Sequence, residues 1–146
     1  GKLYAIQTTA STTEGAQYVY CKKLVKNETG ERPLYTGYHS TVSAFYYGTL
    51  IVGDQFDGNF DGYSALDTNI PLSSLKEPTA FDSPTTFAVA SVIPGWTAAL
   101  QLMRAGERWM LYIPWQSAYG SSGNNDGTIP GYTALTFDLL LERIVE

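Results

Sequence analysis

The chain is poor in the residues that form disulfides and metal sites. Its 146 residues include one cysteine, Cys21, and one histidine, His39. A single cysteine excludes an intramolecular disulfide and a thiolate metal cage, and a histidine without a His or Cys partner is a poor nucleus for a metal site. We therefore predict that Cys21 is a small buried hydrophobic residue. We expect the protein to use neither a metal ion nor a cofactor.

The chain also lacks a basic stripe and a long apolar run. Its formal net charge is -5, and its 9 lysines and arginines are scattered apart from Lys22, Lys23 and Lys26. We expect no nucleic-acid partner, because such surfaces need clustered positive charge, and we interpret the lysine cluster as a solvated strand end. No apolar run approaches the roughly 18 residues of a membrane span, so we expect no membrane-spanning segment.

No leader peptide is visible at Gly1-Lys2-Leu3. The compartment therefore stays open: a bacterial-type envelope or periplasm if a leader has been removed, and the cytoplasm otherwise. A G-x-S-x-G motif is absent as well, so the sequence does not favour Ser-His-Asp catalysis through His39.

What is present favours one domain rich in strands. The length suits a single well-packed core, and the composition of 44% hydrophobic residues with 11 tyrosines favours β-structure. Residues 1–16 show no clear period and are expected to form an N-terminal extension or a frayed arm. A two-residue alternation of apolar and polar residues, typical of strands, occurs at about residues 18–25, 41–50, 85–89, 108–113 and 133–145.

One helix is predicted after Pro94-Gly95. Trp96, Ala99, Leu100 and Met103 fall at positions i, i+3, i+4 and i+7, which places them on a single apolar stripe. Several strands and one short helix predict an α+β fold, in which an antiparallel sheet of about five strands packs on the apolar face of the helix.

One motif between the predicted strands at 41–50 and 85–89 resembles part of a calcium site. Asp57-Gly58-Asn59-Phe60-Asp61-Gly62 fits the first half of an EF-hand loop, but the pattern requires Glu at position twelve, where this chain has Thr68. Neither flank has the pattern of a helix. We therefore favour a turn rich in Asp and Gly over a metal site.

Four sequence motifs follow one another along the chain. They are Tyr46-Tyr47-Gly48-Thr49-Leu50 with Gly53 and Phe56-Asp57; Val92-Ile93-Pro94-Gly95-Trp96 with Ala99-Leu100 and Met103; Ile113-Pro114 with Ala118-Tyr119-Gly120; and Ile129-Pro130 with Ala134 to Leu140. Together they resemble the FKBP-type peptidyl-prolyl cis-trans isomerases over roughly residues 17–57 and 84–145. The resemblance implies an FKBP-like sheet half-wrapped around the helix, and a single isomerase domain at 17–146 with an insertion at about 58–83.

The resemblance also implies an activity and a site. The activity is the rotation of Xaa-Pro peptide bonds in proline-containing polypeptides, inhibited by macrolides of the class that binds FKBPs. Trp96 would form the floor of an apolar cleft, and the Ile93 amide and the Tyr119 hydroxyl would donate hydrogen bonds to the substrate. The residues implied as catalytic are Tyr46, Asp57, Trp96, Tyr119 and Phe137, and those implied to bind substrate are Phe56, Val92, Ile93 and Ile129.

The chain departs from the family pattern in three places. Residues 58–83 are longer than in minimal members, and we expect them to form an ordered excursion at the rim of the cleft, because seven large apolar residues are too many for a solvated loop. Thr85 stands where an aromatic is expected, with Phe87 as a partial substitute. Asn124 or Asn125 replaces residues usual in the loop after Ala118-Tyr119-Gly120.

Two other function classes remain open. One is a binding or chaperone module on the same fold, catalytically weak, that holds proline-containing partners. The other is a carbohydrate-binding β-domain, which would need exposed aromatics such as Trp115 arranged as a platform.

Overall fold

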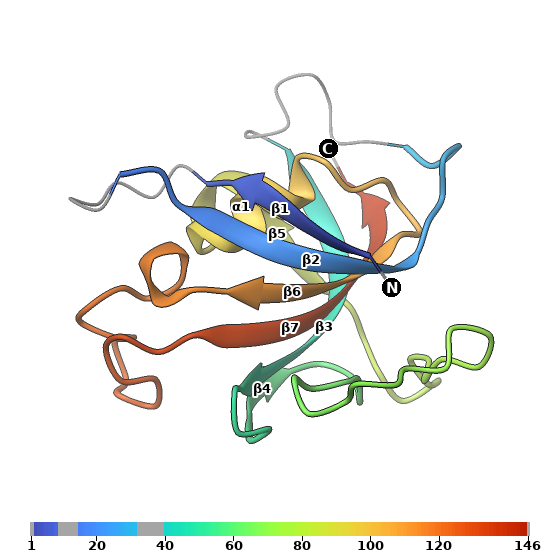
Figure 1. The fold of residues 1–146 in the computed structure, drawn as a ribbon. Helices are drawn as coiled ribbons and strands as arrows, with labels where there is room; N and C mark the ends of the chain where they lie inside the picture. Colours follow the sequence, from blue (N-terminus) through green and yellow to red (C-terminus); the bar gives the residue numbers. More distant parts are fainter. Residues whose placement is uncertain (1, 9–14, 32–39, 146) are drawn as a thin grey trace.

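The computed structural model describes residues 2–8, 15–31 and 40–145, and it is built on one antiparallel sheet (Figure 1). The strand order is β1-β2-β6-β7-β3-β4, and β5 also pairs with β3. The strands are β1 Leu3–Gln7, β2 Tyr18–Val25, β3 Thr41–Leu50, β4 Gln55–Gly58, β5 Thr85–Ala88, β6 Arg108–Ile113 and β7 Leu135–Ile144. The predicted α+β class is confirmed, with seven strands in place of about five.

The first strand was not predicted. Leu3–Gln7 pairs with Lys22–Tyr18 in antiparallel register, so this part of the expected extension is an edge strand and not a frayed arm. Alternate residues Tyr4 and Ile6 pack against the core. The segment is only 5 residues long, and pairing with β2 supplies its order, which a local sequence period does not reveal.

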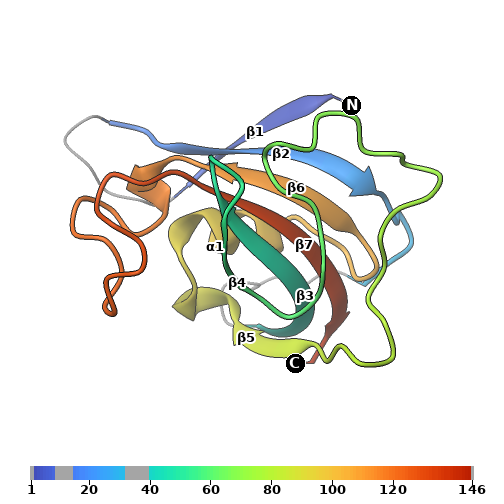
Figure 2. The same cartoon turned by 90° about the horizontal axis from the view of Figure 1, so that it is seen from below.

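The single α-helix of the described residues, α1, runs from Pro94 to Leu100. It is shorter than the apolar stripe suggests, since Met103 lies beyond a turn at Gln101–Leu102. Met103 is nevertheless fully buried in the same cluster as Trp96, Ala99 and Leu100. The helix lies within the curve of the sheet (Figures 1 and 2), which buries its apolar side against β2, β6 and β7.

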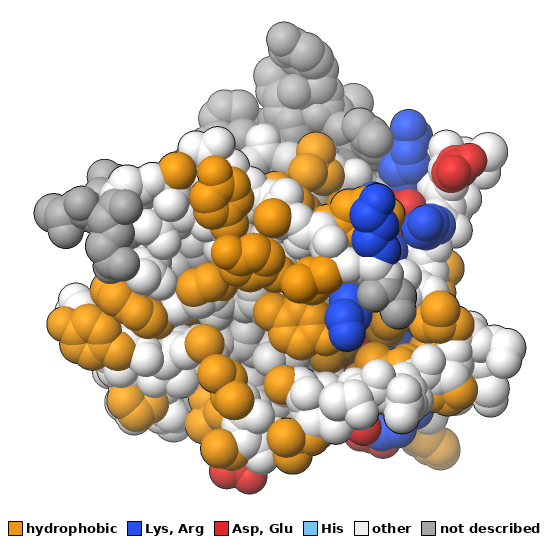
Figure 3. Space-filling model, viewed as in Figure 1, with side chains coloured by type: hydrophobic (Ala, Val, Ile, Leu, Met, Phe, Trp, Pro, Cys, Tyr) orange, Lys and Arg blue, Asp and Glu red, His pale blue; other side chains and the backbone are white. Residues whose placement is uncertain are grey.

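The predicted lysine cluster lies on aromatic rings. The Lys23 Nζ is 4.5 Å from the centre of the Tyr4 ring and 4.9 Å from that of Trp109. The Lys22 Nζ is 5.9 Å from the centre of the Tyr112 ring. Figure 3 shows the result as a mainly hydrophobic face over β1 and β2, with basic side chains among the apolar ones. These two lysines therefore place their ammonium groups over aromatic faces in cation–π contacts.

Residues 58–83 pack on the opposite side of the sheet from α1, not at the rim of a cleft as predicted. In Figure 2 most of this segment, drawn in green, lies beyond the sheet from α1. Tyr63 is buried with Leu24 and Met110, and Ile70 and Leu75 pack against them. Phe60 is buried as well, whereas the remaining large apolar residues are exposed: Leu66, Leu72 and Phe81.

A buried ion pair anchors this excursion. Arg108 on β6 and Asp138 on β7 are 1% and 0% exposed, and the guanidinium donates two hydrogen bonds of 2.8 and 2.6 Å to the carboxylate. The Tyr63 amide donates to the same carboxylate at 3.0 Å, and the guanidinium also donates to the Lys76 carbonyl. The Arg108 guanidinium lies over the Phe60 ring, with its Cζ 5.2 Å from the ring centre. The pair therefore holds both ends of residues 60–76.

The energetic role of this pair can be tested by removing one partner. Arg108→Met should lower the free energy of unfolding by about 3–5 kcal/mol, because it leaves an uncompensated carboxylate in a dry site. Urea denaturation followed by circular dichroism measures this loss. The control is Arg143→Met, which removes an ion pair whose arginine is 63% exposed and should change stability by less than about 1 kcal/mol. Equal losses in the two variants would contradict the anchoring role.

Candidate active site

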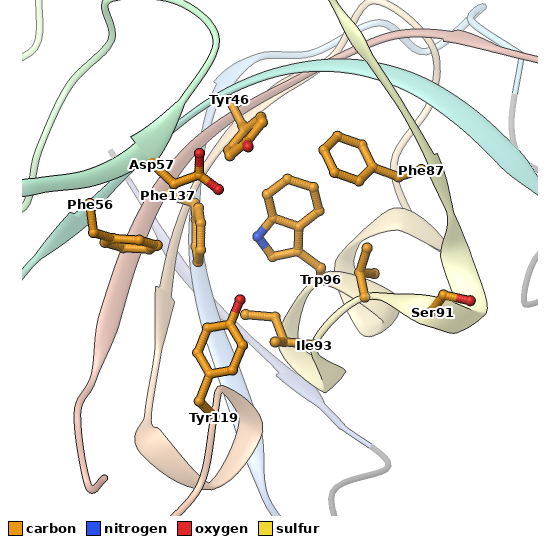
Figure 4. Close-up of a pocket in the computed structure, with 10 residues that line it drawn as sticks. Tyr46, Phe56, Asp57, Phe87, Ser91, Ile93, Trp96, Tyr119 and Phe137 are labelled. Carbon is orange, nitrogen blue, oxygen red and sulfur yellow. The ribbon is translucent and has the colours of Figure 1, made fainter. Parts of the chain in front are cut away.

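A cleft of about 310 Å³ opens between the concave side of the sheet and the first turn of α1 (Figure 4). Aromatic side chains from four strands (β3, β4, β5 and β7), from α1 and from the loop that carries Tyr119 form most of its wall. The lining residues are Tyr46, Phe56, Asp57, Phe87, Ser91, Val92, Ile93, Trp96, Tyr119 and Phe137.

Trp96 forms the floor and is 3% exposed. Its ring meets Tyr46, Phe87 and Phe137 edge to face, with centroids 5.3, 4.9 and 5.2 Å away and interplanar angles of 83°, 69° and 82°. Phe56 meets Phe137 in the same way at 5.5 Å. Such arrangements place positive ring edges on negative ring faces. The walls of the cleft therefore hold one another in fixed orientations.

The local sequence explains why Trp96 sits there. Pro94 occupies the first position of α1, where its missing N–H leaves no hydrogen bond unmade. A Cβ at Gly95 would lie 2.7 Å from the Ile113 side chain, so only glycine lets the helix start approach β6 this closely. Together they fix where the Trp96 ring enters the cleft.

Two tyrosine hydroxyls, the Ser91 hydroxyl and one carboxylate give the cleft its polar rim. Burial, and then the hydrogen bond to Asp57 and its negative charge, raise the pKa of the Tyr46 hydroxyl. Burial, and then the charges of Asp57 and Asp126, raise the pKa of Tyr119. Both hydroxyls therefore stay protonated at neutral pH and remain able to donate. Figure 4 shows the Tyr119 hydroxyl directed into the cleft.

Tyr119 is positioned by the turn around it. The Gly120 amide donates to the Trp115 carbonyl at 2.9 Å, and the Gly120 carbonyl accepts from the Tyr132 amide at 2.9 Å. Gly120 has a φ of 68°, which favours glycine. On the other side of the turn the buried hydroxyls of Ser117 and Thr8 are hydrogen-bonded at 2.8 Å. Thr8, directly after β1, thus braces the loop that carries Tyr119.

The structure brings together every predicted site residue except Ile129. Ile129 is 1% exposed in the main core, and its amide donates to the Asn124 side chain at 2.9 Å. The loop containing Asn124 folds back on Ile129, and the role of Ile129 in substrate binding stays a prediction. Phe87 does line the cleft, as its place two residues after Thr85 suggested. Ser91 was missed, because a 3-10 turn at Val89–Ser91 with no sequence signal brings it to the rim.

The carboxylates of the segment that resembles the first half of a calcium loop have other partners. Asp57 lies beside the Tyr46 hydroxyl, whose pKa it raises, and Asp61 lies 3.8 Å from the Lys76 Nζ. Within residues 2–8, 15–31 and 40–145, no group of three or more His, Cys, Asp and Glu side chains could hold a metal ion. His39 lies outside the described residues.

No helix in the described part of the chain is long and apolar enough to span a membrane.

Comparisons with known proteins agree with this geometry. The sequence model of the FKBP-type peptidyl-prolyl cis-trans isomerases matches residues 36–142. The chain is 52% identical over 76 residues to the macrophage infectivity potentiator of Trypanosoma cruzi, covering 48% of this chain and 38% of that protein. It is 34% identical over 134 residues to the isomerase FkpA of Aeromonas hydrophila, covering 92% and 40%. The chain thus spans about two fifths of the length of these relatives.

Among solved structures, a peptidyl-prolyl cis-trans isomerase from Pseudomonas syringae superimposes with a TM-score of 0.64. The two are 28% identical, and the match covers 95% of this chain and 81% of that one. A half-wrapped antiparallel sheet with an aromatic cleft over one short helix is thus the fold of a known class of isomerases. The chain belongs to the FKBP-type peptidyl-prolyl cis-trans isomerase family.

The role of Trp96 in packing leads to a stability prediction. Trp96→Ala should lower the free energy of unfolding by about 3–5 kcal/mol, since it leaves a cavity among the three rings of Tyr46, Phe87 and Phe137. Trp115→Ala is the control, because Trp115 is only half-buried and outside the cleft lining, and its loss should be clearly smaller. Denaturant titration of both variants measures the difference. A smaller loss for Trp96→Ala than for Trp115→Ala would show that Trp96 does not support the cleft.

Proposed function

We propose that this chain accelerates the cis-trans rotation of Xaa-Pro bonds in polypeptides. The observation that carries the proposal is the cleft itself: a Trp96 floor and aromatic walls, with polar groups confined to the rim. Membership of the isomerase family supports the same conclusion.

The chemistry of this reaction suits an apolar site. Amide resonance imposes a barrier of roughly 18–20 kcal/mol on rotation of a peptide bond. A twisted amide has lost that resonance, is less polar and depends less on water than the planar form. An apolar pocket therefore binds the twisted state better than the planar one, and this difference in binding is the catalysis. No nucleophile is required.

The groups at the rim would fix the rest of the substrate. The Tyr119 hydroxyl and the Ile93 amide are proposed to donate to carbonyls on the two sides of the rotating bond, so that rotation is confined to one torsion. The Ile93 amide has no hydrogen-bond partner within the part of the chain that the structure describes. Tyr46, Asp57 and Phe137 would form the wall against the proline ring.

Two further expectations concern ligands. Phe56 and the apolar groups beside it would receive the side chain before proline, so an apolar residue there should be preferred. A macrolide of the class that fills FKBP clefts should compete with the peptide, because it would occupy the Trp96 floor.

The alternative functions differ in what supports them. A module that binds proline-containing partners without catalysis would use the same cleft, so only a rate measurement separates it from an isomerase. The carbohydrate-binding alternative needs a flat aromatic platform. The Trp115 and Tyr132 rings instead stand at 69° to each other, which does not favour it.

The direct test is an isomerisation assay on short Xaa-Pro peptides by exchange NMR. We expect the protein to speed exchange and the macrolide to abolish the effect. The rate should be constant between about pH 6 and 9, because the tyrosine donors, with pKa values raised above the ordinary value of about 10, stay protonated there. An exchange rate equal to that of the free peptide would favour the binding-only alternative.

Two substitutions separate the roles of the rim groups. Tyr119→Phe should leave stability nearly unchanged and lower kcat/KM several-fold, since one donated hydrogen bond is worth roughly 0.5–1.5 kcal/mol. Asp57→Val should lower activity whether or not calcium is present, because its carboxylate acts within the cleft. Variants as active as the parent at both positions would contradict the assignment of the rim.

A further inference from the structure

Two short strands share one edge of β3 and leave a junction between them. β5 pairs with Thr41–Ala44, and β4 pairs with Tyr47–Thr49. Tyr46, a wall of the cleft, falls between the two pairings. The backbone there needs hydrogen-bond partners that neither strand's register supplies.

Asn59 fills this junction with its backbone and its side chain. Its amide donates to the Tyr46 carbonyl at 2.9 Å, and its side-chain Oδ1 accepts from the Tyr46 amide at 2.8 Å. Its Nδ2 donates to the Ala44 carbonyl at 3.1 Å and to the Thr85 hydroxyl at 3.0 Å. One residue therefore continues the ladder along β3 and ties it to the first residue of β5.

The neighbours of Asn59 explain how it reaches this place. A Cβ at Gly58 would lie 2.9 Å from the Tyr46 carbonyl oxygen, so glycine lets the chain leave β4 close against β3. On the other side Phe60 packs edge to face with Phe45, their centroids 6.0 Å apart, and lies over Arg108. Asn59 is thus positioned on one side by Gly58, which lies close against β3, and on the other by Phe60, which packs on Phe45 and Arg108.

The bonds of Asn59 join the three strands that carry one wall of the cleft. Tyr46 comes from β3, Asp57 from β4 and Phe87 from β5. Tyr46 and Phe87 meet edge to face, with ring centroids 5.4 Å apart, and the Asp57 carboxylate lies close enough to the Tyr46 hydroxyl to raise its pKa. Thr85, which departs from the family pattern, supplies the β5 end of the link.

We infer that Asn59 is a positioning residue for the isomerase cleft, which sets Tyr46 against Phe87 through the Ala44 and Thr85 bonds. The inference rests on the proposed function. Asn59 itself is not among the residues that line the cleft, so it acts on the substrate only through the wall that it holds. A wall displaced by a fraction of an ångström would fit the twisted amide less well, which lowers the rate more than the affinity.

The test compares four variants with the parent. Asn59→Ala removes all side-chain bonds, and Asn59→Asp keeps the acceptor for the Tyr46 amide but loses both donated bonds. Thr85→Val removes only the link to β5. Ser43→Ala is the matched control, because it deletes a hydrogen bond of 2.9 Å to Glu142 from the same strand outside the cleft. For each, kcat and KM per folded molecule are measured, together with hydrogen exchange of the Tyr46 amide.

We expect kcat/KM of Asn59→Ala to fall about 3- to 10-fold, through kcat and not KM. Three side-chain hydrogen bonds are lost, and only part of their free energy acts on the cleft wall. Its Tyr46 amide should exchange faster relative to Leu111 on β6, whereas Asn59→Asp should keep that amide protected and still lose activity. Thr85→Val should show a smaller loss, and Ser43→Ala should match the parent.

Two results would overturn the inference while leaving the proposed function intact. One is an Asn59→Ala variant as active as an active parent. The other is an equal loss per folded molecule in Asn59→Ala and Ser43→Ala, which would mean a general effect on the sheet. An inactive parent would instead contradict the proposed function, and the inference with it.

Discussion

The two-residue alternation of β7 is the constraint on which the rest of the structure depends. Phe137 and Leu139 face α1 and the cleft, while Asp138 between them faces the other side. Because a strand cannot slip by one residue without exchanging its two faces, the cleft wall and the buried ion pair fix each other's register. The aromatic site and the packing of residues 58–83 therefore both depend on the register of β7.

Asn59 connects these two sides. The ion pair of Arg108 and Asp138 holds Phe60 and Tyr63 on the outer face of the sheet. Asn59, directly before Phe60, then meets the backbone of Tyr46. Packing on one face of the sheet thus helps to define the aromatic wall on the other. The structure gives the long excursion a supporting role at the cleft, although it lies away from the rim.

The sequence predicted most of what depends on local pattern. The strands Tyr18–Val25 and Thr41–Leu50 have the expected bounds, because their alternation is uninterrupted. The family motifs located all but one of the proposed site residues in the cleft, since motif residues keep their positions when loops change. Ile129 lies outside the lining of the cleft, in a loop that folds by its own hydrogen bonds. β1, the face covered by residues 58–83 and the role of Asn59 depend on pairings between distant residues, which no local period encodes.

The central claim is that a proline-containing peptide binds over Trp96. The indole Nε1 of Trp96 is buried without a hydrogen-bond partner among the described residues, and so is that of Trp109 in the core behind it. An NMR titration of ¹⁵N-labelled protein with an Xaa-Pro peptide reports on both groups at once. We expect the Trp96 indole resonance to shift as the peptide is added, while the Trp109 indole resonance stays in place. A Trp96 resonance that does not move at saturating peptide would contradict it.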